Sequence, residues 1–427
     1  MSVLFKDIYV LTPSGRAEKS SVYVSGERIV SVGEAPEGSK ADRVIDGKDR
    51  LLMPGLVNSH THVYMTMFRS CADDIPFSDW LFRRIMPLED QMTPDDCYWA
   101  TLLGYTEMLS TGTTASLDMY VFTETAVRAA EEAKVRAVLC RGLSGGADDE
   151  AGGKRRLDEA QKEISAYRGK NPLISFMLGP HAPYTCDEGY LKETAELAAS
   201  LDLPMTIHVS ESKNEIETVR EKYACTPVEF LDRAGVLTDR TVAAHCVFLT
   251  DGDIDILVRR GVNAAINPVS NLKLGNGVAP VVKMQKRGVK LCLGTDGAAS
   301  NNALNMFRDM GCLCLLHKGM SGDAAAVGAA DALKMATVGG ARALGLEDVG
   351  EIKPGMKADL TVIDLDRPWL RPFNDPASSL IYSATGSEVE SVMVNGKFLL
   401  DKGELTTIDR ERVYYETEKT CRRLGLL

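Results

Sequence analysis

Leu56-Val-Asn-Ser-His-Thr-His62 is the stretch that decides the fold, a short apolar run that ends in two histidines. Seven more short apolar runs follow it, at 114–120, 136–143, 174–181, 204–211, 241–248, 263–270 and 290–296. Between them lie stretches with helical periodicity, among them 95–110, 123–133, 155–166, 188–201 and 251–260. Strands that alternate with helices in this way run parallel, because each helix carries the chain back across the sheet. Eight such units over about 290 residues predict an α/β protein with a (β/α)8 TIM-type barrel.

An open, doubly wound sheet is the alternative for the same alternation. Its usual mark is a G-x-G-x-x-G turn after the first strand, and the sequence has none there.

The two ends of the chain have a different pattern. Short alternating or apolar runs punctuated by Gly, Asp and Pro predict strands at 4–11, 21–24, 28–32 and 43–45, and again at 359–364, 389–394 and 398–400. We therefore expect the two terminal segments to complete one sheet.

The composition is that of an ordinary soluble globular protein, with 44% hydrophobic and 26% charged residues. The net charge of −11 argues against nucleic acid or an anionic membrane surface as a partner. Ten cysteines without a C-x-x-C pair indicate reduced thiols rather than a disulfide framework or a thiolate metal site. With no leader peptide or membrane-length apolar stretch in the sequence, the predicted location is cytoplasmic.

The histidines carry the main functional signal. Only six occur, and five of them lie at the predicted carboxyl ends of strands: His60, His62, His181, His208 and His245. These strand ends form the active-site face of a TIM-type barrel, so the five imidazoles are expected to converge there with Asp296. His317, the sixth, has no role that the sequence indicates.

The spacing of His60 and His62 favours a metal site. A period of two along a strand puts both imidazoles on one side, where they can bind the same ion. Adding His208 and Asp296 gives three nitrogens and one carboxylate, a set that suits Zn²⁺ or a similar divalent metal.

Three further roles stay open at this point. Glu211 lies three residues after His208, so a continuing strand would turn its side chain away from the site. It reaches the site as a proton shuttle only if the chain bends there. Otherwise it is a solvated residue before a helix at 212–221. His245 is either a core histidine or a site residue. Asp296 could also cap the segment that contains Ser300 and Asn301.

Six motifs carry a family resemblance that runs nearly end to end. They are Met53-Pro-Gly-Leu-Val-Asn-Ser-His-Thr-His62, His208-Val-Ser-Glu211, Ala244-His-Cys246, Asn267-Pro-Val-Ser-Asn-Leu-Lys-Leu-Gly275, Gly294-Thr-Asp-Gly-Ala-Ala-Ser-Asn301 and Gly355-Met-Lys-Ala-Asp359. The chain resembles the metal-dependent amidohydrolase superfamily and, within it, the methylthioadenosine/S-adenosylhomocysteine deaminases. The resemblance implies one divalent metal per subunit, Zn²⁺ first and Fe²⁺ or Mn²⁺ as alternatives. It also implies a barrel at 55–347 and a β-sandwich built from 1–54 plus 348–427.

The same resemblance assigns the substrate-binding residues. In Trp80-Leu-Phe-Arg-Arg-Ile-Met-Pro-Leu-Glu89, the glutamate takes the ribose hydroxyls and the tryptophan lines the nucleoside pocket. His181 contacts the nucleoside, with His208 and Ser300 beside it. Arg141 and Arg156 meet the carboxylate of an S-adenosylhomocysteine substrate, with Arg155 as the competitor of Arg156.

The implied reaction is hydrolytic deamination of a 5′-substituted adenosine to the inosine derivative and ammonia. In it, Glu211 moves a proton to N1, His245 polarises the attacking oxygen, and Asp296 takes the water proton. The alternative is another hydrolase of the superfamily that acts on guanine, cytosine, a pterin or a triazine. A non-enzymatic role is disfavoured because all four ligands and Glu211 are present. The partner is a small-molecule nucleoside, and a homo-oligomer, dimer or tetramer, is expected.

Overall fold

The strands of the two chain ends, most of which pair antiparallel, form a sheet separate from the parallel strands in the structure, a computed structural model that describes residues 1–427. The parallel strands lie in the middle of the chain. Their bounds are β6 Leu56–Thr61, β7 Thr113–Tyr120, β8 Arg136–Leu143, β9 Ile174–Phe176, β10 Gly179–Pro180, β11 Met205–Val209, β12 Thr241–His245, β13 Asn263–Ile266 and β14 Lys290–Leu293.

The parallel strands form two hydrogen-bonded groups that meet at both edges. One group has the order β10-β8-β7-β6, with β9 on β8, and the other has the order β11-β12-β13-β14. They are joined at one edge by a parallel bridge between Leu178 and Met205, and at the other by the Asp296 N–H, which donates to the His60 carbonyl at 2.9 Å. The result is a curled parallel sheet, consistent with the predicted TIM-type barrel.

Side chains inside the curled sheet make a core of their own. It draws on both groups of strands, through Val57, Leu117, Val138, Met177, Val242, Ala265 and Cys292. Because helices cover the outer face as well, the strands are buried on both sides and read as continuous apolar runs.

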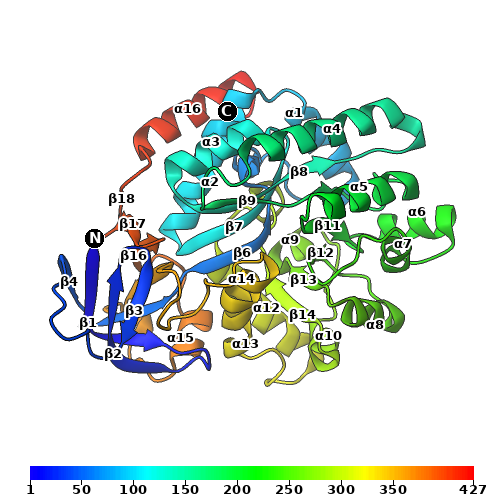
Figure 1. Cartoon of the computed structure of the whole chain (residues 1–427). Helices are drawn as coiled ribbons and strands as arrows, with labels where there is room; N and C mark the ends of the chain where they lie inside the picture. The colour runs from blue at the N-terminus through cyan, green and yellow to red at the C-terminus, as the bar shows by residue number, and fades with distance from the viewer.

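Helices connect and surround these strands (Figure 1). The α-helices are α1 Met86–Glu89, α2 Pro94–Ser110, α3 Thr123–Ala133, α4 Glu150–Tyr167, α5 Glu188–Ser200, α6 Lys213–Tyr223, α7 Pro227–Arg233, α8 Asp251–Arg260, α9 Pro268–Lys273, α10 Val281–Arg287, α11 Ala298–Asn301, α12 Met306–Ser321, α13 Ala329–Lys334, α14 Gly340–Ala343, α15 Pro376–Tyr382 and α16 Arg410–Arg423. Short 3-10 or π-helical turns are η1 Val63–Phe68, η2 Asp79–Ile85, η3 Ala147–Asp149, η4 Met335–Gly339 and η5 Pro368–Leu370.

The two chain ends build one nine-stranded sheet, as the sequence predicts. Its strands are β1 Ser2–Leu11, β2 Ala17–Ser25, β3 Arg28–Val32, β4 Arg43–Asp46, β5 Arg50–Pro54, β15 Leu360–Asp364, β16 Val389–Val394, β17 Lys397–Asp401 and β18 Glu404–Leu405. The ends meet where β5 pairs antiparallel with β15. In Figure 1 the blue N-terminal strands therefore lie beside the orange-to-red C-terminal ones.

One buried ion pair ties the terminal sheet to the parallel strands. Arg136, the first residue of β8, donates from Nε and Nη2 to the two carboxylate oxygens of Asp359 at 2.7 and 2.9 Å. Both side chains are almost completely buried. Asp359 also accepts the N–H of Asn395 at 2.8 Å, so three segments that are distant in sequence meet at one carboxylate.

Two further features of the structure concern membrane-spanning segments and disulfides. No helix is long and apolar enough to cross a membrane. All ten cysteines are free.

Candidate metal centre and active site

Four histidines and one aspartate converge at the carboxyl ends of the parallel strands. The ligand atoms of His60, His62 and His208 lie within 4.8 Å of one another, and so do those of His60, His245 and Asp296. These side chains come from β6, β11, β12 and the turn after β14. The structure thus brings together all the residues that the sequence predicts as metal ligands.

The hydrogen bonds of two histidines fix which ring nitrogen carries the proton. Nδ1 of His62 lies 2.8 Å from the carbonyl oxygen of Met119, and Nδ1 of His208 lies 2.7 Å from that of His181. A carbonyl can only accept, so both Nδ1 atoms donate and both Nε2 atoms present lone pairs. These Nε2 atoms face each other at 3.3 Å.

A carboxylate oxygen joins this cluster of lone pairs. Oδ1 of Asp296 lies 3.4 Å from Nε2 of His62 and 3.6 Å from Nε2 of His60. Both ring nitrogens of His60 are buried without a hydrogen-bond partner. Acceptors that converge without a proton repel one another unless a cation lies between them, so the donor set fits a divalent metal.

Burial keeps His60 and His208 neutral, as metal ligation requires. It lowers the pKa of His60 to about 4 and that of His208 well below its usual value. For Asp296, burial raises the pKa, but the nearby histidines, His60 first, outweigh burial and bring the pKa well below its usual value, so that the carboxyl is ionised.

Two serines orient Asp296. Its Oδ2 accepts hydrogen bonds from the hydroxyls of Ser270 at 2.6 Å and Ser300 at 2.7 Å, which leaves Oδ1 facing the histidines. Ser300, expected among the substrate contacts, therefore has the aspartate as its partner in this structure. Ser270 was not identified as a site residue from the sequence, although it lies in one of the six motifs.

Glu211 reaches the site because the chain bends after β11. It is buried, its Oε1 accepts from Nδ2 of Asn276 at 3.2 Å, and the same oxygen lies 3.9 Å from Nε2 of His245. Burial and the charge of Asp296 raise its pKa well above the usual value. Such a carboxyl is suited to holding and releasing a proton.

His245 is a site residue with a fixed ring. Its Nδ1 lies 2.8 Å from Oδ1 of Asn271, and its Nε2 is buried without a partner beside Glu211. The backbone of His245 has a φ of +74°, a left-handed conformation that is uncommon for a residue other than glycine. Strain of this kind collects at functional sites.

A cavity of about 370 Å³ opens beside the histidine cluster. Four expected substrate contacts line it: Glu89, Arg141, Arg156 and His181. Several other lining residues were not predicted from the sequence, among them Tyr64, whose hydroxyl donates to Oε1 of Glu89. Its place two residues after His62 was the available signal.

Trp80 does not line this cavity. Its ring packs against Phe77, and its Nε1 donates to the carbonyl of Ala299 at 3.3 Å. The cavity wall is formed instead by Leu81 and Phe82. The π-helical geometry of η2 changes which side chains share a face, and sequence periodicity does not reveal that change.

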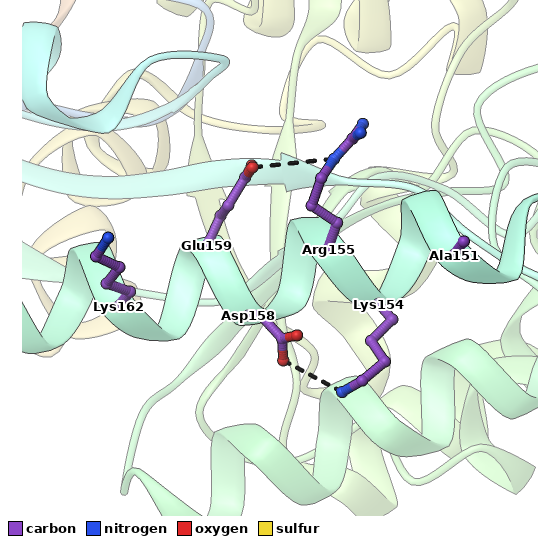
Figure 2. Close-up of a pocket in the computed structure, with 6 residues that line it drawn as sticks. All are labelled: Ala151, Lys154, Arg155, Asp158, Glu159 and Lys162. Atoms are coloured by element: carbon purple, nitrogen blue, oxygen red, sulfur yellow. Dashed lines mark hydrogen bonds and ion pairs between the residues drawn. The ribbon is translucent and has the colours of Figure 1, made fainter.

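The two candidate arginines of α4 point in different directions. Arg155 lies on the outer face of the helix, where it pairs with Glu159 at 3.9 Å and is 69% exposed (Figure 2). Arg156 lines the cavity, donating from Nε to the Ser144 carbonyl at 2.7 Å and from Nη2 to Asp149 at 2.5 Å. The geometry therefore favours Arg156 as the one that can meet a ligand.

Arg141 is held by two glutamates of the same helix. Its Nη1 donates to Glu163 at 2.9 Å and its Nη2 to Glu159 at 2.6 Å. A guanidinium with two carboxylate partners presents little net positive charge to a ligand.

His317 lies apart from the other five histidines. It is buried on α12 and belongs to no cluster of metal-ligating residues.

Comparison with known proteins gives a consistent set of relatives. The sequence model of the Amidohydrolase family matches residues 51–399. A 5-methylthioadenosine/S-adenosylhomocysteine deaminase of Caldanaerobacter subterraneus subsp. tengcongensis is 47% identical over 99% of both chains. A 5′-deoxyadenosine deaminase of Methanothermobacter thermautotrophicus is 45% identical over 96% of both. Among solved structures, a zinc-bound adenosine deaminase from Xanthomonas campestris superimposes with a TM-score of 0.95 at 33% identity, covering 100% of this chain and 99% of its own.

Proposed function

The chain belongs to the amidohydrolase family, and from that premise we propose that it is a metal-dependent deaminase of 5′-substituted adenosines. In this reaction water adds at C6 of the adenine, the exocyclic amine leaves as ammonia, and hypoxanthine remains. The names of its relatives point to 5′-methylthioadenosine, S-adenosylhomocysteine and 5′-deoxyadenosine as the substrates.

The convergent lone pairs of His62, His208 and Asp296 are the observation that carries this proposal. With His60 they form a three-nitrogen, one-carboxylate donor set that a single divalent ion would satisfy. We propose Zn²⁺, with Fe²⁺ and Mn²⁺ as alternatives, because imidazole and carboxylate ligands suit all three. When bound, the ion would supply Lewis acidity that makes a water molecule nucleophilic near neutral pH.

Three side chains handle protons and charge in the proposed reaction. Glu211, with its raised pKa, delivers a proton to N1 of the purine. His245, whose Nδ1 donates to Asn271, directs the lone pair of its partnerless Nε2 at the attacking water and polarises it by accepting a hydrogen bond. Asp296 accepts the proton of the attacking water and passes it toward the leaving amine, while Ser270 and Ser300 hold its carboxylate in orientation.

The cavity supplies the nucleoside site. Glu89 is the proposed partner of the ribose hydroxyls, because a carboxylate can accept from two hydroxyls at once, and His181 is the proposed nucleoside contact. Arg156 and Arg141 lie on the wall where a 5′ substituent would end. A free base needs none of these four residues, so they separate the nucleoside proposal from a deaminase of guanine or cytosine.

Ammonia release tests the proposal directly. Zinc-loaded protein is given 5′-methylthioadenosine, S-adenosylhomocysteine, 5′-deoxyadenosine, adenosine, guanine and cytosine, and the adenine-to-hypoxanthine absorbance change is followed in parallel. We expect turnover of the 5′-substituted adenosines. Release of ammonia only from a free base would keep the metal site and overturn the nucleoside assignment.

Two proposals concern the whole chain. Residues 55–347 form the catalytic barrel, and 1–54 with 348–427 form a second domain in which the terminal sheet folds over its own core as a β-sandwich. That core includes Phe5, Val22, Leu52, Val362 and Phe398. We also propose a homodimer or homotetramer, which light scattering of the purified protein would test.

A further inference from the structure

The bend that carries Glu211 into the site is a strained backbone segment. Strand β11 ends at Val209, and the next residue, Ser210, has a φ of +52° and is completely buried. A residue other than glycine adopts this left-handed conformation only where its surroundings enforce it. The bend reverses the direction in which Glu211 would point on a continuing strand.

A single buried carboxylate holds this bend. Oε1 of Glu215 accepts the N–H of Ser210 at 2.7 Å, and Oε2 accepts the N–H of Glu211 at 2.8 Å. Glu215 is completely buried in the first turn of α6. Its two oxygens thus fix the orientation of two consecutive peptide groups, and with them the direction of the Glu211 side chain.

This use of a first-turn carboxylate differs from that in the next two helices. In α7 and α8, Glu229 and Asp253 return to the N–H of their own N-cap residue, which completes a capping box. In α6 the N-cap Ser212 accepts the N–H of Glu215 at 3.2 Å, but the carboxylate reaches past Ser212 to the two preceding residues. The Glu215 carboxylate therefore holds the bend instead of capping the helix, and its two hydrogen bonds to the N–H groups of Ser210 and Glu211 are called the clamp below.

The Glu211 side chain has little else to hold it. Its carboxylate accepts one hydrogen bond, from Asn276 at 3.2 Å, and His245 is 3.9 Å away. The accuracy of its position therefore comes mainly from its backbone. Displacing a reacting group by about 1 Å lowers a rate by about 100-fold.

We propose that Glu215 is a positioning residue for the deamination, acting through the backbone amides of Ser210 and Glu211. The inference rests on the proposed function, in which Glu211 moves a proton. Glu215 itself contacts neither the cavity nor the ligand cluster.

Glu215→Gln tests the inference with little change in size. A glutamine has one accepting oxygen, and its NH2 group faces the second backbone N–H, so the clamp loses half of its contacts. We expect kcat to fall by about 10- to 100-fold with KM and zinc content close to those of wild type. In a crystal structure of the variant, Glu211 should be displaced. Glu215→Asp, which keeps the carboxyl group but cannot span both amides, should behave in the same way and serves if the glutamine variant does not fold.

Asp253→Asn is the matched control. Asp253 is also a buried first-turn carboxylate that accepts a backbone N–H, at 2.8 Å, but in α8 and away from Glu211. It should lower thermal stability and leave kcat within about twofold of wild type.

A merely structural role for Glu215 predicts a different outcome. A zinc-loaded Glu215 variant with lowered Tm but kcat within about twofold of wild type would overturn the inference. If the wild type releases no ammonia from any adenosine, the proposed function fails instead. In that case the crystal structure still decides, because an unmoved Glu211 in the variant would overturn the clamp.

Discussion

His62 and His208 each commit one ring nitrogen to a backbone carbonyl, and this fixes the chemistry of the other. Because both Nδ1 atoms donate, the two Nε2 lone pairs meet at 3.3 Å with Asp296 beside them. The histidines therefore present a preformed ligand set, in which backbone oxygens determine the tautomer. His245 lies beside this set, with its ligand atom within 4.8 Å of those of His60 and Asp296, and Glu211 lies 3.9 Å from His245.

Glu211→Gln is the most direct test of proton transfer at the residue scale. Glutamine keeps the size of the side chain but cannot move a proton, so kcat should fall by roughly 100- to 10,000-fold. Zinc content should stay at the wild-type level, as measured by atomic absorption.

Glu388→Gln is the control for Glu211→Gln. Glu388 is also buried, but in the turn before β16, and its variant should keep full turnover. Near-normal activity of the Glu211 variant would remove the proton-shuttle assignment.

Glu89→Gln tests the ribose contact. Burial raises the pKa of Glu89 while its hydrogen bond from Tyr64 lowers it, and the carboxylate forms part of the cavity wall. Losing one acceptor for the ribose hydroxyls should raise KM for 5′-methylthioadenosine by about tenfold. An unchanged KM in steady-state assays would argue for a substrate without a ribose.

The sequence alone predicted the positions of the residues that lie at the carboxyl ends of strands. His60, His62, His181, His208, His245 and Asp296 converge because parallel strands end on the same face. Glu211 could be assigned only conditionally, because the Ser210 bend depends on Glu215, a contact that becomes visible only once α6 is placed. Trp80 could not be oriented from the sequence, since η2 winds as a π-helix.

At the scale of elements, α4 contributes Arg156 to the cavity wall and holds a second wall residue, Arg141. Its inner face offers Arg156 to the cavity, whereas Arg155 joins the charged outer face in Figure 2. The same helix supplies Glu159 and Glu163, which hold Arg141 at 2.6 and 2.9 Å. A substrate carboxylate would therefore have to compete with these glutamates for Arg141.

The double variant Glu159→Gln/Glu163→Gln tests that competition. Removing both charges should raise kcat/KM for S-adenosylhomocysteine relative to 5′-methylthioadenosine by about three- to tenfold, because only the former has a carboxylate. The ratio of the two substrates in one preparation corrects for any loss of folded protein. A ratio equal to that of the wild type would mean that Arg141 does not bind the carboxylate of the 5′ substituent.

Local sequence patterns predicted the elements well, and the differences occur where the chain turns. The expected helix at 251–260 and strand at 389–394 agree with α8 and β16. The run at 263–270 was expected as one strand, but it is β13 followed by α9, because Pro268 begins a helix. Apolar periodicity alone does not distinguish a buried strand from the short buried helix that follows it.

At the scale of the whole molecule, the terminal sheet and the parallel strands are joined by few buried polar contacts. One of them is the ion pair of Arg136 and Asp359, with both oxygens of the carboxylate engaged. The alternation of strands and helices predicted the parallel sheet, and the terminal strand patterns predicted the terminal sheet. Neither pattern predicts a contact between side chains 223 positions apart, such as that of Arg136 with Asp359.

Arg136→Met should destabilise the protein by roughly 3–5 kcal/mol, because it leaves the Asp359 carboxylate buried without its cation. Urea denaturation followed by circular dichroism would measure this loss.

Arg28→Met is the matched control, since Arg28 pairs with Asp348 at 3.1 Å with both side chains over 40% exposed. Its stability should stay within about 1 kcal/mol of wild type. Equal losses in the two variants would contradict the importance of burial for the Arg136 pair.

The metal dependence of deamination tests the central claim most directly. Protein stripped with a chelator and then reloaded with one equivalent of Zn²⁺ is assayed for ammonia release from 5′-methylthioadenosine and S-adenosylhomocysteine. We predict that stripping abolishes turnover and that zinc restores it with one ion bound per chain. Full turnover by the stripped protein, or one bound zinc per chain with no ammonia from either nucleoside, would contradict the account.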